Sequence, residues 1–263
     1  MPDTGEAMIE FAKAEDSKPV RVILHHGWTE MGQGVHTMAL QVFCEETKLD
    51  PSWVEVMVDT SFETVCGMTT ASRGTSLVGN AIIEAAKKLK EDLKTHSPVQ
   101  LIGRRYRGKW VCDWTNKPGC VGNEEITHYS YSYATQLVIL DAYGKIDTVL
   151  AAHDAGKIIN PILFEGQIEG SIHMGLGYAL TENLPMEGGF PVSTKLKDCG
   201  ILRAGQMPRI IVRGVEERDP HGPYGAKGVG EIGLVPTAAA VSNALFQFDK
   251  KRRYALPLYE KKM

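Results

Sequence analysis

Residues 155–180 read AGKIINPILFEGQIEGSIHMGLGYAL, and this stretch decides how the rest of the chain is interpreted. Large apolar residues recur in it every four positions, at Phe164, Ile168, Ile172 and Leu176. That spacing predicts a long helix after Asn160-Pro161, because residues four apart share one helical face. Glycine weakens a helix, so we interpret Gly166 and Gly170, which share a face, as a place where a backbone or ligand approaches closely.

Two strand, loop and helix units precede this helix. A strand is expected at 20–24, then a glycine-containing loop that ends at Gly34, then a helix. The expected apolar face of that helix consists of Val35, Met38, Ala39, Val42 and Phe43. Alternating residues at 54–58 predict a second strand, and the loop 59–74 leads into a second helix with apolar residues from 78 to 89. We expect the polar stretch 90–122, with its basic cluster at 104–109, to be irregular and solvated.

The remaining pattern mixes strands and helices. Alternating residues at 129–139, a turn at 142–145 and apolar residues at 146–151 predict a hairpin. Another strand is expected at 209–215, and a last helix opens near Pro236. Since no regular βαβ repeat emerges, the predicted fold class is α+β. We expect two mixed lobes, 1–120 and 121–263, which divide near 115–125.

Composition excludes several classes of partner and cofactor. A net charge of -3 over 263 residues, without a basic stripe, predicts no nucleic-acid binding, and no stretch is apolar enough to span a membrane. The five cysteines are far apart and form no CxxC pair, so any iron–sulfur cluster would lie on another domain or chain. The first residues carry three carboxylates and no basic segment, which favours a cytoplasmic location.

Three glycine-containing loops open helices, at 29–34, 69–74 and 225–233. Backbone N–H groups at a helix start attract anions, although glycine in such loops equally serves to make tight turns. The spacing Gly228, Gly230, Gly233 matches a dinucleotide-binding loop, but no strand is expected before it, so a nicotinamide site is an alternative only. No metal-ligand motif occurs; the neighbouring His25 and His26 end a strand and form a poor chelate.

Glu231 is the most distinctive candidate for chemistry. It lies between Gly230 and Gly233 with apolar residues after it, where a dry pocket would raise the pKa of its carboxyl toward that of a useful base. The alternative is an exposed carboxylate that the start of a helix favours.

Taken together, five blocks resemble the xanthine dehydrogenase/aldehyde oxidase family of molybdenum hydroxylases. They are TEMGQGVHT (29–37), TTASRGT (69–75), AGKIINPILFEGQIEG (155–170), MGLGYALTE (174–182) and AKGVGE (226–231). The resemblance implies that this chain forms the second half of a molybdopterin-binding domain, closest to bacterial xanthine dehydrogenase. Family members often have prolines directly after the catalytic glutamate, whereas here Ile232-Gly233-Leu234 and then Val235 come before Pro236.

The resemblance also implies roles for individual residues. Glu231 would be the catalytic base, which takes a proton from the oxygen nucleophile while the cofactor carries the redox step. The implied cofactor-binding residues are Gly32, Gln33, Gly34, Ala71, Ser72, Arg73, Gln167, Lys227 and Gly228. No residue is implied as a direct metal ligand.

The first half of the family's molybdenum subunit has no counterpart here. The resemblance therefore implies partners: the missing half, an iron–sulfur subunit and possibly a subunit carrying FAD. We expect an oxidoreductase that hydroxylates a purine-like N-heterocycle with water-derived oxygen and is inactive as this chain alone. The alternatives are an aldehyde or nicotinate-type hydroxylase, a nicotinamide-binding protein, and an inactive structural or assembly homologue.

Overall fold

The computed structural model describes residues 3–15, 18–58, 64–116, 118–119 and 125–258, which form two compact units. The first unit contains Met1–Tyr131, Gly156–Asn160 and Glu216–Gly228, and the second contains Ser132–Ala155, Pro161–Val215 and Val229–Met263. Both units combine helices and strands, which confirms the α+β class. The predicted division into two lobes, 1–120 and 121–263, is not tested by these compact units and stays a prediction.

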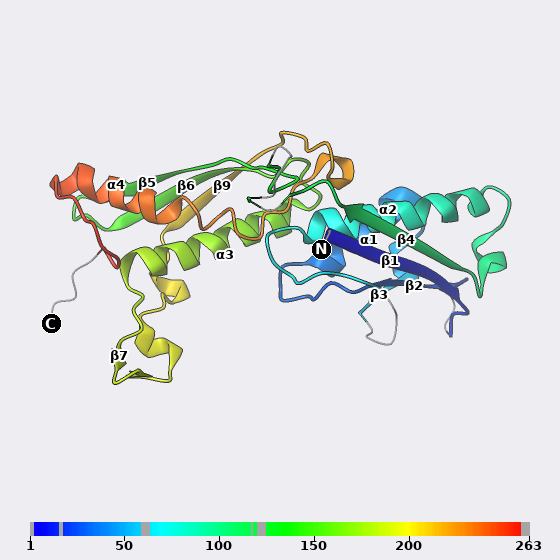
Figure 1. Cartoon of the computed structure of the whole chain (residues 1–263), viewed down its shortest axis with the longest axis horizontal. Coiled ribbons are helices and arrows are strands. Elements are labelled where there is room, and N and C mark those ends of the chain that lie inside the picture. The colour runs from blue at the N-terminus through cyan, green and yellow to red at the C-terminus, as the bar shows by residue number, and fades with distance from the viewer. Residues whose placement is uncertain (1–2, 16–17, 59–63, 117, 120–124, 259–263) are drawn as a thin grey trace. The chain divides into compact units, whose positions relative to one another are not determined.

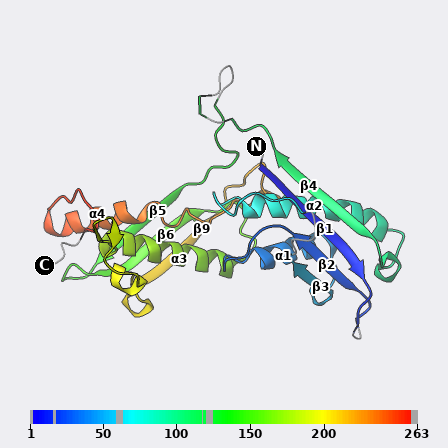
Figure 2. The ribbon, with the colours of Figure 1, turned by 60° about the horizontal axis from the view of Figure 1, so that its bottom comes forward.

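The first unit is a four-stranded sheet covered by two helices on one face (Figures 1 and 2). Its strands are β1 (Asp3–Ala12), β2 (Arg21–His26), β3 (Val54–Met57) and β4 (Arg105–Cys112), in the order β3-β2-β1-β4. The central strand β1 runs antiparallel to both neighbours, and β2 pairs with β3 in parallel. The helices are α1 (Val35–Thr47) and α2 (Gly74–Leu93).

The core of this unit lies between the sheet and the two helices. All five residues expected on the apolar face of α1 are buried, so the helical periodicity at 35–43 is confirmed. Phe11 from β1 and Phe43 from α1 are at most 1% exposed. Burying a side chain of this size contributes about 2 to 3 kcal/mol relative to leaving it in water, so the sheet and helices stabilise one another.

Two strands were not expected, and the expectation of an irregular 90–122 is wrong. Helix α2 continues to Leu93 and β4 pairs with β1. The basic residues of β4 do face solvent, but carboxylates of β1 pair with them: Glu6 with Arg107 and Lys109, Glu10 with Arg105. Such ion pairs join residues about a hundred positions apart, so the charged sequence of each strand alone did not indicate a sheet.

The second unit has a three-stranded sheet, β5-β6-β9, with helices on one face (Figure 2). Its strands are β5 (Ala134–Leu140), β6 (Ile146–Asp154) and β9 (Arg209–Val215), and its helices are α3 (Pro161–Leu180) and α4 (Thr237–Asp249). The hairpin β5-β6 is antiparallel, and β6 pairs with β9 in parallel. A small hairpin joins β7 (Met186–Glu187) to β8 (Phe190–Pro191). The described residues also form short 3-10 helices: η1 (Pro51–Trp53), η2 (Pro98–Leu101), η3 (Leu196–Cys199), η4 (Ala204–Gln206) and η5 (Pro223–Gly225).

The long helix predicted after Asn160-Pro161 is α3, and the four apolar residues of the predicted spacing, Phe164, Ile168, Ile172 and Leu176, are buried as expected. The structure differs from the sequence-based interpretation at Gly166 and Gly170. A β-carbon built on Gly166 or Gly170 meets no atom within 4 Å among the described residues, so none of these residues brings its backbone close to the two glycines. In the hairpin, the strand begins at Ala134, so Tyr129 and Tyr131 precede it.

Candidate functional site

In the loop before α1, the polar side chains form hydrogen bonds with the backbone of the same loop. The Gln33 side chain accepts a hydrogen bond from Met31 N at 2.6 Å and donates one to Thr29 O at 2.8 Å. The Glu30 carboxylate accepts hydrogen bonds from the backbone N–H groups of Gly32, Gly34 and His36 at 2.8, 2.9 and 3.2 Å. The sequence was compatible with an anionic ligand at this helix start or with glycine that only makes a tight turn. The backbone amides bind an anion of the loop itself, the Glu30 carboxylate, which was not among the candidate residues.

Electrostatics support this assignment of Glu30. Partial burial acts to raise the pKa of its carboxyl, but the hydrogen bonds from Gly34, His36 and Gly32 outweigh burial and leave the pKa below its ordinary value. The carboxylate is therefore held ionised on the amino end of α1. An anionic ligand could bind these amides only by displacing Glu30.

A buried imidazole lies beneath the same loop. His26 is fully buried, its Nδ1 accepts a hydrogen bond from Trp28 N at 3.1 Å, and its ring lies 5.1 Å from that of His36. Burial, with a smaller contribution from His36, lowers the pKa of His26 from 6.5 to about 4. The side chain is neutral at neutral pH, which agrees with the structural interpretation of His25-His26.

The second loop, before α2, holds an unusual backbone. Ala71 and Ser72 both adopt left-handed conformations, with φ of 57° and 52°. Two consecutive residues of this kind are strained and persist only where surrounding structure imposes them. Arg73 helps to impose it: its guanidinium forms an ion pair with Asp3 and donates to Met68 O at 2.9 Å.

The third loop packs directly on the second. A β-carbon built on Gly228 would lie 1.3 Å from the carbonyl oxygen of Ser72, so the two backbones touch at a position that only glycine permits. Lys227, beside it, is only 8% exposed. The segment is also anchored by the AGKIIN block, since Gly156 forms a β-bridge with Ala226 and Lys157 N donates to Gly225 O at 3.0 Å. The first unit thus brings three of the sequence blocks together.

The second unit holds the remaining candidates, Gln167 and Glu231. The Gln167 side-chain amide, on α3, donates a hydrogen bond to Gly230 O at 2.9 Å, directly before Glu231. The Glu231 side chain itself is exposed. The dry pocket expected around this carboxylate is therefore absent from the described part of the chain, and any burial would have to come from another chain or a ligand.

A residue that supports residues 230–233, the glutamate loop, was not among the candidates found from the sequence. Gln136, on β5, donates a hydrogen bond to Gly233 O at 2.7 Å, and the hydroxyl of Thr237 donates to the same oxygen at 3.1 Å. A β-carbon on Gly233 would lie 2.5 Å from that of Ser171 on α3. A single glutamine in an alternating strand carries no local signal of such a contact.

The residues before Gly228 form η5, not a strand, and the last strand before it, β9, ends at Val215. The strand that a nicotinamide-binding loop requires is thus missing there. No three histidine, cysteine or acidic side chains converge as a metal site within the described ranges. Within the same ranges, no helix has the length and apolar character needed to cross a bilayer.

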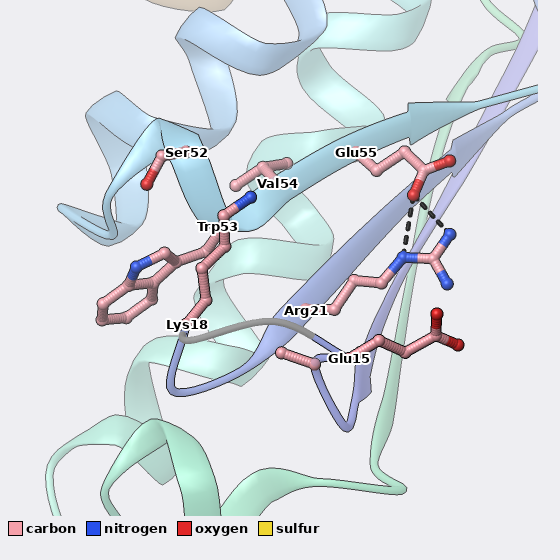
Figure 3. Close-up of a pocket in the computed structure, with 8 residues that line it drawn as sticks. Glu15, Lys18, Arg21, Ser52, Trp53, Val54 and Glu55 are labelled. Atoms are coloured by element: carbon pink, nitrogen blue, oxygen red, sulfur yellow. Dashed lines mark hydrogen bonds and ion pairs between the residues drawn. The ribbon is translucent and has the colours of Figure 1, made fainter.

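A cavity of about 470 Å³ lies elsewhere in the first unit, at the β2-β3 edge (Figure 3). Figure 3 shows Arg21 turned toward Glu55, to which its Nε donates at 2.8 Å, with Trp53 and Lys18 on the other side. None of the candidate site residues lines this cavity. It is therefore separate from the glycine-containing loops.

Comparison with known proteins identifies the family. The chain matches the molybdopterin cofactor-binding domain model over residues 12–103 and 100–208, and it belongs to this family. It is 27% identical, over 93% of its length, to the 6-hydroxypseudooxynicotine dehydrogenase complex subunit gamma of Paenarthrobacter nicotinovorans, covering 36% of that protein. It is 26% identical, over 90% of its length, to a putative xanthine dehydrogenase molybdenum-binding subunit of Escherichia coli (strain K12), covering 36% of that subunit.

Other matches agree. Aldehyde oxidase 4 of Rattus norvegicus is 30% identical over 81% of this chain, which spans 18% of that enzyme. The fold matches the aldehyde oxidoreductase of Desulfovibrio gigas with a TM-score of 0.83 at 24% identity, covering 99% of this chain and 30% of the other. These findings confirm the resemblance to molybdenum hydroxylases. The chain spans about a third or less of the length of these proteins.

The geometry fits an anionic cofactor better at one loop than at another. The N-cap residue of α2, Arg73, makes no side-chain cap hydrogen bond, so the first backbone N–H groups of this helix, beside the left-handed Ala71-Ser72, are suited to an anionic group. The amides before α1 are already bound by Glu30, and the Gln33 amide is bound within its own loop. The loop at 69–74 is thus the better candidate for a phosphate or pterin contact.

Proposed function

We propose that this chain supplies the glutamate and part of the cofactor-binding loops of an oxidoreductase that hydroxylates a purine-like N-heterocycle, of the xanthine dehydrogenase type. The observation that carries the proposal is the glutamate loop, in which side chains on α3 and β5 bind the carbonyl oxygens of Gly230 and Gly233 while Glu231 is exposed. A loop held at both ends presents its carboxylate in a defined place.

In this proposal, residues of this chain would contribute to cofactor placement and to proton transfer. The first backbone amides of α2, with Ala71, Ser72 and Arg73, would bind a molybdopterin cofactor, and the packing of Gly228 on Ser72 sets the spacing of two of its loops. A bound cofactor would supply the two-electron oxidation. Glu231 would accept the proton from the water-derived oxygen that attacks an electron-poor carbon of the substrate. Gln33 and Gln167 would contact the cofactor only by giving up their present hydrogen bonds.

The site is incomplete without a second polypeptide or domain. The exposed Glu231 has no dry pocket here, and the relatives are about three times longer or more. We therefore propose that the missing half encloses the glutamate, that an iron–sulfur protein and possibly a flavin protein take the electrons, and that the complex is cytoplasmic. Relatives named for xanthine, an aldehyde or a nicotine derivative leave aldehyde and nicotinate-type substrates as alternatives.

The test is to purify the chain alone and together with the protein that supplies the missing half, then to measure molybdenum, molybdopterin and turnover of xanthine, nicotinate and an aldehyde. We expect little metal and no turnover from the chain alone, and stoichiometric metal with turnover from the pair. Stoichiometric metal and turnover in the isolated chain would refute the half-site. A pair that binds the cofactor but turns over nothing would favour the inactive homologue, and a pair without cofactor would overturn the proposal.

A further inference from the structure

Among the described residues, the side chains of Gln167, Gln136 and Thr237 donate hydrogen bonds to backbone carbonyl oxygens of the glutamate loop. Gln167 binds the carbonyl oxygen of Gly230 at one end. At the other end, Gln136 and Thr237 both donate to the carbonyl oxygen of Gly233. Gly233 is buried, so its carbonyl oxygen depends on these partners rather than on water.

Gln136 reaches the loop from the sheet. It lies on β5 opposite Ala151 of β6, on the face that bears the buried Val138, whereas its neighbours Thr135 and Leu137 face solvent. Strands hold side-chain directions firmly because their backbones are fixed by the ladder. Gln136 is therefore a rigid support, unlike a residue of the loop itself.

The amide orientation of Gln136 follows from its two neighbours. Its Nε2 lies 2.7 Å from Gly233 O and 3.4 Å from His153 Nε2. The reversed amide would set its oxygen against the carbonyl oxygen, which is repulsive, so nitrogen must face Gly233. His153 is fully buried, and burial lowers the pKa of its imidazole, so a neutral ring is available to accept the second N–H.

We propose that Gln136, supported by His153, is a positioning residue that orients Glu231 through the carbonyl oxygen of Gly233. This inference rests on the proposed function, in which Glu231 is the base. Glycines flank Glu231 at positions 230 and 233, and glycine restricts the backbone least, so the loop needs external hydrogen bonds to hold one conformation. Loss of the Gln136 amide would leave Thr237 as the only donor described for Gly233 O.

The first experiment compares Gln136→Leu with Thr135→Val in the complete enzyme. Leucine keeps much of the volume of Gln136 but donates no hydrogen bond, and Thr135 is the exposed neighbour on the same strand. We expect Gln136→Leu to lower kcat per molybdenum by about tenfold to a hundredfold, as misplaced catalytic groups do, with KM and metal content nearly unchanged. Thr135→Val should leave all three unchanged. An unchanged kcat, or a loss that follows only the loss of metal, would overturn the inference.

The second experiment separates positioning from general damage. In Glu231→Gln, the base is absent, so adding Gln136→Leu should not lower the residual rate further, because effects that act through one group are not additive. An equal loss in both backgrounds would mean a structural role and would overturn the inference. If Gln136→Leu fails to accumulate, Gln136→Glu replaces it: its protonated form can donate to Gly233 O, so its activity relative to the parent enzyme at the same pH should rise as pH falls, and a flat ratio would contradict the inference.

The two variants test separately whether Glu231 is the base and whether Gln136 orients it. If Glu231→Gln retains full activity, the proposed function fails whatever Gln136 does. If Glu231→Gln is inactive and Gln136→Leu is fully active, only the positioning role fails.

Discussion

Replacing Gly228 by alanine tests the contact that joins two candidate cofactor loops. The added methyl carbon would lie 1.3 Å from Ser72 O and 2.5 Å from the carbonyl carbon of the same residue. Ordinary contact begins at about 3.4 Å, so the two backbones must separate by roughly 2 Å. No rotamer change can relieve the clash, because the methyl group and the carbonyl are both fixed to backbone.

The magnitude follows from that geometry. Overpacking relieved by side chains costs about 1 to 3 kcal/mol, and a clash between two backbones belongs at or above the upper end. We therefore expect Gly228→Ala to lower the free energy of unfolding by about 3 kcal/mol or more, a large part of the 5 to 15 kcal/mol typical of a domain. The strained backbone at Ala71-Ser72 should lose its protection from hydrogen exchange first, because the segment around Gly228 that packs on it is displaced.

The assay combines urea unfolding with amide hydrogen exchange over residues 69–76. A matched control is Gly166→Ala, because its β-carbon meets nothing within 4 Å. We expect faster exchange at 69–76 and lower cofactor content in the complete enzyme for Gly228→Ala only. A Gly228→Ala variant within about 0.5 kcal/mol of the parent, with unchanged exchange, would refute the contact between the loops.

Three further outcomes follow. Gly166→Ala should stabilise the chain by about 0.5 to 1 kcal/mol, because alanine suits an exposed helix interior better than glycine; a lower melting temperature would contradict this. His26 has a folded pKa of about 4 against 6.5 unfolded, so its stability contribution, intact above pH 6.5, should fall as pH drops toward 4, by about 2 kcal/mol at pH 5. His26→Asn, which keeps an acceptor for Trp28 N, should flatten this pH profile of unfolding free energy, and an unchanged slope would exclude His26 as its source. Gln33→Ala removes both loop hydrogen bonds and should lower molybdenum occupancy with activity per metal near normal; unchanged occupancy would argue against a cofactor role for this loop.

Local periodicity was sufficient for the helices. The apolar residues of α1 and α3 are buried as their spacing predicted, and α3 begins at Pro161, where proline suits a first helical position. The strand at 209–215 was also predicted correctly as β9. In each case the signal lies within one segment, because a single buried face determines the pattern.

Tertiary interactions explain what was missed. The charged residues of β1 and β4 form ion pairs across the sheet, and neither strand's sequence alone shows this pairing. Gly108 of β4 lies against α2, and a β-carbon at this position would be 2.0 Å from Ala81 O. The Glu30 carboxylate accepts hydrogen bonds from the backbone amides of Gly32 and Gly34, which the sequence suggested as a site for an anionic ligand. The contact of Gln136 with Gly233 joins residues 97 positions apart, so no window of sequence contains it.

The candidate residues were found because five sequence blocks occur together in this chain. The structure gives a physical reason why some of these blocks occur together. The first unit places Ser72 against Gly228 and Gly156 beside Ala226, so three blocks depend on one another physically. For Glu231, the neighbouring residues allowed either a dry pocket or an exposed carboxylate before a helix, and the side chain is exposed. Periodicity cannot reveal burial that a second polypeptide would have to provide.

The most direct test of the account is Glu231→Gln in the complete enzyme, because glutamine keeps the shape of the side chain and removes its ability to accept a proton. Molybdenum per chain and turnover per molybdenum should both be measured with the same substrate. If Glu231 is the base, the metal content should be unchanged and the rate should fall by at least about a hundredfold, the usual consequence of losing a general base. Retention of most of the activity per molybdenum would mean that Glu231 is only an exposed residue before α4 and that the proposed mechanism is wrong.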